Sequence, residues 1–125
     1  MRYNIEQIEN TTVFRIDETE FTKNTGSRDS CRRDLINQVM KNRSVVLDMS
    51  AIRYIDTASI VLLIEIRRIA RKLGQDLVIA GVKLPTSLKS AMKSGVEKFI
   101  DVYANVETAL IATTTPLQEL ILKVE

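Results

Sequence analysis

The sequence predicts an α/β fold: a single domain built on a small mixed β-sheet, with helices packed mainly on one face. Three observations carry this prediction. The apolar runs SVVLDMS and DLVIAGV have the length of buried strands, and segments of helical period lie between and after them. Hydrophobic residues make up 45% of the 125 residues, which is enough apolar surface for one core. The chain contains no internal repeats, low-complexity segments or linkers.

The amino-terminal elements are expected to be a hairpin and a helix. TTVFRI, residues 11–16, is rich in β-branched and aromatic residues and predicts a strand, with YNIEQI before it as the hairpin partner. Residues 17–27 are polar and turn-like. From Ser27 a helical pattern places apolar residues on one face: Cys31, Leu35, Val39 and, less regularly, Met40.

The middle of the chain predicts the centre of the sheet and its longest helix. Val45, Val46 and Leu47 form the short apolar run expected of a strand buried on both faces. After AIRYIDT the apolar spacing changes to three and four residues, which indicates a helix from about Thr57 with Gly74 as its stop. DLVIAGV then predicts a second buried strand.

The carboxy-terminal part is expected to contain two more helices and a short strand. LPTSLKSAMKSG, residues 84–95, has Pro85 in the first helical turn and Gly95 as a stop. KFIDVY predicts the last strand. NVETALIAT predicts a helix with Asn105 as N-cap and Thr108 three residues later.

We assign residues 1–112 to the domain and residues 113–125 to a carboxy-terminal tail. TTPLQELILKV predicts a short helix whose apolar stripe docks on the domain, or else forms a surface for a partner or for a homodimer. The residues of this stripe are Leu117, Leu120, Ile121 and Val124.

Composition argues against several function classes. The net charge of +2 is too small to indicate a nucleic-acid or membrane partner. The chain has no histidine and one cysteine, so we expect no metal, no cofactor and no enzymatic activity. A polar amino terminus and short apolar runs predict a cytoplasmic protein. Four basic residues are expected on the solvent side of one helix: Arg67, Arg68, Arg71 and Lys72.

The stretch YIDTAS, residues 54–59, is the main candidate site. Asp56 precedes the predicted helix and can cap it by accepting hydrogen bonds from its first amides, a duty that Thr57 or Ser59 could share. The first turn of a helix also tolerates a phosphate, and phosphorylation of a hydroxyl there would add charge to a surface. The residues alone leave both interpretations open.

The succession VVLDMSAIRYIDTASIVLLIEIRRIARKLGQDLVIAGV, followed by LPTSLKSAMKSGVEKFIDVYANVETAL, resembles the STAS domains of anti-sigma factor antagonists. The resemblance implies a bacterial protein whose partner is an anti-sigma factor with serine/threonine kinase activity. It places the motif aspartate at Asp56, the phosphoacceptor at Thr57 and the following small residue at Ala58. Ser59, where the family usually has glycine, is a second candidate acceptor, and we expect it to be exposed or half-exposed.

The expected partner-binding face combines two loops with the helix start. It consists of Glu20, Phe21, Thr22, Lys23, Asn24, Ser50, Ala51, Arg53, Ala58 and Ser59. One alternative is a scaffold subunit of the same fold that is never phosphorylated. A remoter alternative is a receiver domain phosphorylated on Asp48, although the acidic pair that a receiver needs to hold Mg²⁺ is poorly placed. Asp48 is more simply explained as a turn-capping residue.

Overall fold

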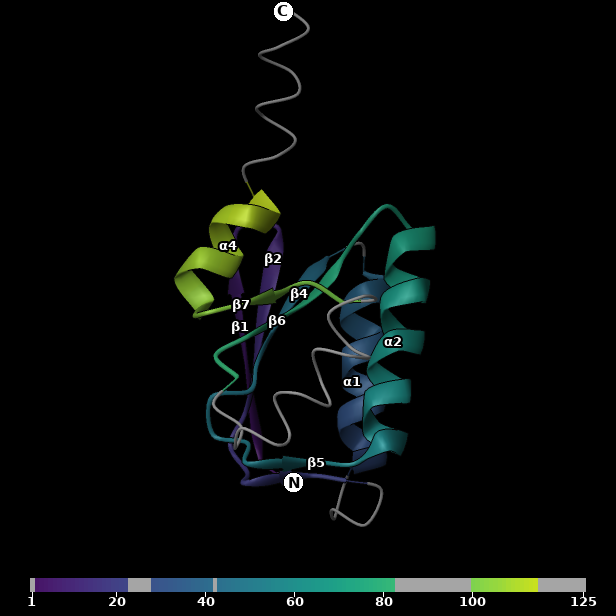
Figure 1. Ribbon diagram of the computed structural model, residues 1–125. Helices are drawn as coiled ribbons and strands as arrows, with labels where there is room; N and C mark the ends of the chain where they lie inside the picture. The colour runs from purple at the N-terminus through teal and green to yellow at the C-terminus, as the bar shows by residue number, and fades with distance from the viewer. Residues whose placement is uncertain (1, 23–27, 42, 83–99, 115–125) are drawn as a thin grey trace, which may run out of the picture.

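A five-stranded mixed sheet forms the centre of the computed structural model, which describes residues 2–22, 28–41, 43–82 and 100–114 (Figure 1). Across the sheet the order is β1-β2-β4-β6-β7. β1 and β2 are antiparallel, and every other neighbouring pair is parallel. The bounds of these strands are β1 (Tyr3–Ile8), β2 (Thr11–Ile16), β4 (Ser44–Asp48), β6 (Leu77–Ala80) and β7 (Val102–Tyr103). The predicted hairpin and central strands are confirmed.

The helices cover both faces of this sheet unequally. α1 (Arg28–Met40) and α2 (Thr57–Lys72) lie on one face, and α4 (Val106–Thr114) lies on the other (Figure 1). The prediction of helices mainly on one face is therefore confirmed. Asn105 caps α4 as predicted, because its Oδ1 accepts a hydrogen bond of 2.8 Å from the backbone N–H of Thr108.

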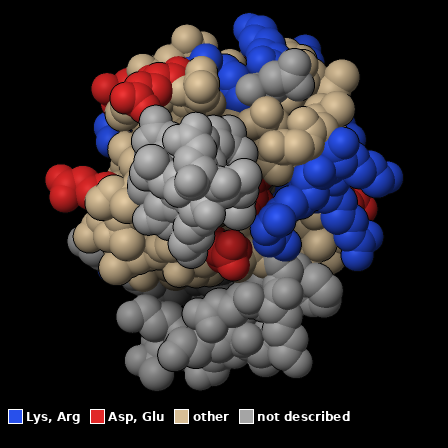
Figure 2. Space-filling view, turned by 90° about the horizontal axis from the view of Figure 1, so that it is seen from above, with Lys and Arg blue, Asp and Glu red and all other residues tan. Residues whose placement is uncertain are grey.

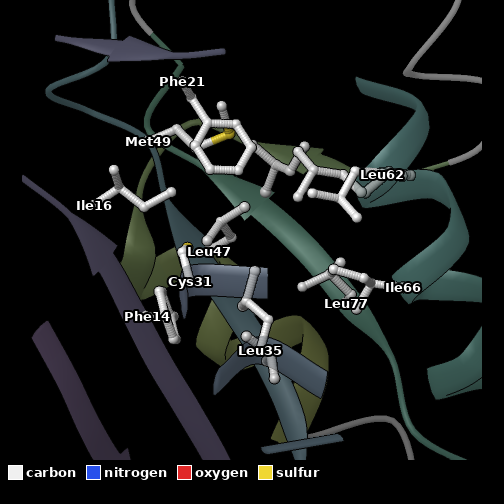
Figure 3. Close-up of a cluster of buried hydrophobic side chains, with 14 of the residues drawn as sticks. Phe14, Ile16, Phe21, Cys31, Leu35, Leu47, Met49, Leu62, Ile66 and Leu77 are labelled. Carbon is white, nitrogen blue, oxygen red and sulfur yellow. The ribbon is translucent and has the colours of Figure 1, made fainter. Parts of the chain in front are cut away.

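β4 is buried on both faces because helices pack on each side of it. Val45 and Leu47 belong to the larger cluster under α1 and α2, part of which is shown in Figure 3, whereas Val46 belongs to the smaller cluster under α4. Side chains alternate between the two faces of a strand, so a continuous apolar run is what this position requires.

Two local predictions need correction. Met40 is 60% exposed, so the buried side of α1 consists of Cys31, Leu35 and Val39 without it. Residues 17–27 were expected to be turn-like throughout, but β3 (Glu20–Phe21) pairs in parallel with β5 (Tyr54–Ile55) as a separate small sheet. This pairing joins segments that are more than thirty residues apart in the sequence.

Two predicted helices lie outside the described residues: the helix over residues 84–95 and the tail helix from residue 115 onward. α4 extends to Thr114, so the first two residues assigned to the tail continue this helix.

We predict that the thiol of Cys31 is unreactive in the folded protein. Its side chain is fully buried, and burial raises the pKa of the thiol to about 12. Because the thiolate is the nucleophile, Ellman's reagent at neutral pH should leave Cys31 unmodified until the chain is unfolded in guanidinium. A Thr57→Cys variant supplies the control, since its second thiol is exposed and should react in the native state. Equal native rates for both thiols would contradict the prediction.

Candidate functional site

The candidate site lies at the end of the sheet where α2 begins. β2, β4 and β6 run in parallel, so their carboxyl ends meet at the same edge, where ligand and partner sites of α/β folds commonly gather. The chain segments 17–22 and 49–56, together with the first turn of α2, form this end, which we call the Thr57 pole. It lies near the label β5 in Figure 1.

The pairing of β3 with β5 fixes the approach of the chain to α2. Phe21 lies opposite Ile55 in this pairing, and both side chains are buried. A backbone hydrogen bond of 2.7 Å from the N–H of Arg53 to the C=O of Thr19 extends the connection. Figure 3 shows Phe21 and Met49 at the same end of the apolar cluster. The segment that leads into α2 is thus held both by its pairing with β3 and by the burial of Ile55 in the core.

This anchoring corrects part of the predicted partner face. Phe21 is completely buried and Thr22 is 8% exposed, so neither offers its side chain to a partner. The physical reason is the alternation along β3: Glu20 faces solvent and Phe21 fills the core. Lys23 and Asn24 lie outside the described residues.

Asp56 is the N-cap of α2, as predicted. Its backbone is extended, with φ −90° and ψ 166°, and its Oδ1 accepts a hydrogen bond of 2.9 Å from the N–H of Ser59. Its C=O accepts a bond of 3.1 Å from the N–H of Ile60. The carboxylate therefore satisfies one of the amides that a helix start leaves without an intrahelical partner.

The three residues that follow Asp56 differ sharply in solvent exposure. Thr57 and Ala58 are exposed, whereas Ser59 is completely buried. The prediction that Ser59 is exposed or half-exposed is wrong, and with it Ser59 loses its place as an accessible acceptor or partner contact. Ser59 belongs to the stripe that α2 turns toward the core, together with Leu62, Leu63, Ile66 and Ala70.

Among the other predicted contacts, Glu20, Ser50 and Arg53 are exposed and Ala51 is half-buried. Two exposed apolar side chains lie at the same pole outside the predicted face, Tyr54 at 49% and Val61 at 48% exposure. The sequence carried a signal for each. Tyr54 alternates with the buried Ile55 in β5, and Val61 follows Thr57 by four residues, which places it on the same side of α2.

Asp48 anchors the loop that leads to this pole. Its Oδ2 accepts a hydrogen bond of 2.9 Å from Nε of Arg15, and its Oδ1 accepts one of 3.0 Å from the N–H of Ser50. Burial by itself would raise the pKa of Asp48, but the bonds from Arg15 and Ser50 outweigh it and hold this pKa below its ordinary value. The predicted turn-capping role is confirmed, and the carboxylate is engaged in an ion pair.

Gly81 keeps the neighbouring loop close to Asp48 and Ser50. It has a positive φ of 74°, and a Cβ at this position would come within 3.1 Å of the Ser50 Cβ and 3.3 Å of Asp48 Oδ1. Both the backbone conformation and the space favour glycine here. The two loops that follow β4 and β6 can therefore pack directly against each other.

The opposite end of α2 is basic. Figure 2 looks onto this end and shows Lys and Arg side chains gathered over the final turns of α2. Arg67 and Arg71 hold Asp76 at 3.3 and 3.2 Å, and Arg68 and Lys72 are exposed, as predicted for a solvent-facing side. The Thr57 pole and this basic end lie at opposite ends of the same helix.

Within the described residues, no cluster of three or more acidic, histidine or cysteine side chains is arranged to bind a metal ion. The helices in that part of the chain are also too short or too polar to cross a membrane.

Residues 2–109 match the model of the STAS domain family. The chain belongs to this family. A search of curated protein sequences finds no match.

Solved structures show the same STAS fold. An RsbS variant from Moorella thermoacetica, in which a serine is replaced by glutamate, has a TM-score of 0.76 and 23% identity, covering 94% of this chain and 99% of that chain. A STAS domain protein from Planctomyces limnophilus has a TM-score of 0.75 and 12% identity, covering 90% and 98%. SpoIIAA of Bacillus in its phosphorylated form has a TM-score of 0.63 and 12% identity, covering 87% and 96%.

We predict that the cap at Asp56 stabilises the STAS domain measurably. Asp56→Ala should lower the free energy of unfolding by about 1 kcal/mol, the usual cost of removing an N-cap side chain. Asp56→Ser retains a capping oxygen and should recover most of this loss. Urea denaturation followed by circular dichroism measures both variants. Equal stability of Asp56→Ala and the unmodified chain would contradict the capping role.

We predict that the Arg15–Asp48 pair makes stability depend on pH in acid. The folded pKa of Asp48 is lowered, so its contribution is complete above the ordinary carboxyl value of about 4 and is lost as the pH falls through the folded value. Arg15→Met should lower the free energy of unfolding at neutral pH and flatten its decline in acid. Urea denaturation at a series of pH values tests this, with Arg53→Met as the control for loss of one exposed arginine. An unchanged pH profile in Arg15→Met would contradict the prediction.

Proposed function

We propose that this STAS domain is an anti-sigma factor antagonist of the bacterial cytoplasm, switched by phosphorylation of Thr57. In this proposal the unphosphorylated chain binds an anti-sigma factor with serine/threonine kinase activity and thereby frees a sigma factor. The kinase transfers phosphate to the Thr57 hydroxyl, and the modified chain no longer binds. The chain acts by binding and serves as the substrate of its partner, not as an enzyme.

The observation that carries this proposal is the accessibility of Thr57 on a rigidly positioned turn. Thr57 is exposed, while Asp56 immediately before it is held by the cap bond to Ser59, and Ile55 before that is buried. A kinase therefore finds a hydroxyl that is reachable but fixed in place relative to the core. Ser59, the other hydroxyl of this turn, is withdrawn from any kinase by burial.

The proposed switch works through surface charge. A phosphate on Thr57 would add about −1.5 to −2 charges next to the carboxylate of Asp56. Tyr54 and Val61, both about half exposed, offer apolar contact area for a partner at the same pole. Covering a phosphate with such a contact would bury a charge, which is costly unless the partner supplies a matching one. Loss of binding after phosphorylation is the expected consequence.

The proposed partner surface keeps the exposed members of the predicted face and adds the two apolar ones. It comprises Glu20, Ser50, Arg53, Tyr54, Thr57, Ala58 and Val61, with Ala51 half-buried among them. The fold supports this role because SpoIIAA, an anti-sigma factor antagonist with the same fold, is known in unphosphorylated and phosphorylated forms.

We predict that Thr57 carries phosphate in the cells that produce this protein. Peptide mass spectrometry of the chain purified from those cells, during growth and after stress, should find the phosphate on Thr57 and none on Ser59. Thr57→Val, which removes the hydroxyl at nearly constant volume, should abolish the signal. Absence of phosphate under all conditions would overturn the switch and favour the unphosphorylated scaffold.

The same cells provide a test of partner release. Thr57→Glu should lose the kinase that co-purifies with the unmodified chain. Thr108→Glu is the matched control, because it places the same charge on an exposed threonine in the first turn of α4. Equal retention of the kinase by both variants would contradict a charge-based switch at Thr57.

A further inference from the structure

The outer edge of β1 is a hydrogen-bonding surface that the site at Thr57 does not use. β1 is the first strand of the sheet and pairs with β2 on one side. Five of its six residues are exposed, and Ile5 and Ile8 are 37% and 36% exposed. Among the described residues, no strand pairs with its other side. A strand edge of this kind can accept another strand.

The pairing with β2 determines which backbone groups point outward. The hairpin joins Ile8 to Thr11 through a two-residue turn, and at the other end the C=O of Arg2 accepts a hydrogen bond of 2.8 Å from the N–H of Asp17. In an antiparallel pair, hydrogen-bonded residues alternate with residues that face away. The even-numbered residues of β1 therefore bond to β2. The N–H and C=O groups of Tyr3, Ile5 and Gln7 face the open edge.

These outward groups are arranged for pairing with a second, identical strand. An antiparallel copy related by a two-fold axis at Ile5 would join Ile5 to Ile5 and Tyr3 to Gln7 of the second copy, so that all three outward residues bond. The two Ile5 side chains would meet on the face that carries α1, because Ile5 lies opposite Phe14 of the larger cluster. An axis at Glu6 would instead set two carboxylates against each other.

Charge on the other face of the strand favours the same register. With the axis at Ile5, Glu6 lies directly opposite Asn4 of the second copy, and its two diagonal neighbours on that copy are Arg2 and Glu6. The Arg2 side chain is 80% exposed and its Nε pairs with Oε1 of Glu18 at 3.9 Å, so a second acidic group can approach its guanidinium from the solvent side. The symmetry produces the attractive Arg2–Glu6 approach twice and the repulsive Glu6–Glu6 approach once. The edge is therefore complementary to itself in hydrogen bonds and apolar contact, and its attractive charge pairs outnumber the repulsive one.

We propose that two copies of this chain associate through antiparallel pairing of their β1 strands, centred on Ile5. The two five-stranded sheets then continue as one, with α1 and α2 of both copies on the same face. Because the two-fold axis stands perpendicular to the sheet, it reverses the strand direction, and the two Thr57 poles lie at opposite ends of the assembly. Both poles remain open, so this dimer forms independently of the phosphorylation state of Thr57.

The oligomeric state in solution tests the proposal. We expect sedimentation equilibrium of the full chain to show a monomer–dimer equilibrium in the micromolar range, because a single strand edge makes a small interface. Ile5→Lys should shift the sample to monomer. Ile5→Pro should do the same, since the N–H that it removes faces the open edge and not β2. Ile111→Lys, at a 64% exposed position of α4, should leave the dimer intact.

Cysteine cross-linking tests the register. Ile5→Cys should form a disulfide-linked dimer on mild oxidation, because its Cα would lie about 5.5 Å from its symmetry mate. Gln7→Cys lies on the same edge and face, yet its mate would be four residues away along the strand, about 14 Å, so it should remain monomeric. Cys31 is buried and does not compete. A monomer at all concentrations, a dimer that survives Ile5→Lys, or equal cross-linking of both cysteines would overturn the proposal.

Discussion

Burial of β4 on both of its faces is the constraint on which the rest of the structure depends. Val45 and Leu47 must be covered by α1 and α2, and Val46 must be covered by α4. This requirement places helices on each side of the strand, and parallel pairing with β2 and β6 puts the carboxyl ends of all three strands at the same end of the sheet. The loop that follows is then held by Asp48, whose bonds to Arg15 and Ser50 keep the chain near the core before α2 begins. The position of Thr57 is a consequence of this sequence of contacts.

Elements defined by local patterns could be predicted from the sequence, and elements defined by distant pairing could not. The apolar run at Val45–Leu47 and the capping role of Asp56 depend on a few neighbouring residues, so both can be predicted from the local sequence. β3 has two residues in a polar segment, and it exists because Glu20 and Phe21 meet Tyr54 and Ile55. No periodicity signals a strand that short. The burial of Phe21 therefore could not be seen until the chain was folded.

The burial of Ser59, in contrast, could have been predicted, because the sequence contained the pattern that indicates it. Its spacing of three, four and seven residues from Leu62, Leu63 and Ile66 matches the core-facing stripe of a helix. The hydroxyl group of Ser59 suggested a phosphoacceptor, whereas its position on the helix places the side chain in the core. A polar residue in an amphipathic helix is better judged by the face that it occupies than by its functional group. The same rule places Val61 outside, on the side of Thr57.

At the start of α2, the residues that stabilise the helix and the residue proposed as phosphoacceptor are different, although they are close neighbours in the sequence. Asp56 caps the helix through the N–H of Ser59, and the buried Ser59 side chain continues the core stripe, so neither task needs the hydroxyl of Thr57. Successive residues of a helix lie about 100° apart around its axis, and the two residues between the cap and the core stripe, Thr57 and Ala58, face solvent. A phosphate on Thr57 can change the surface offered to a partner without removing a bond that holds the helix start. Such a turn suits a switch that acts on binding and leaves the fold intact.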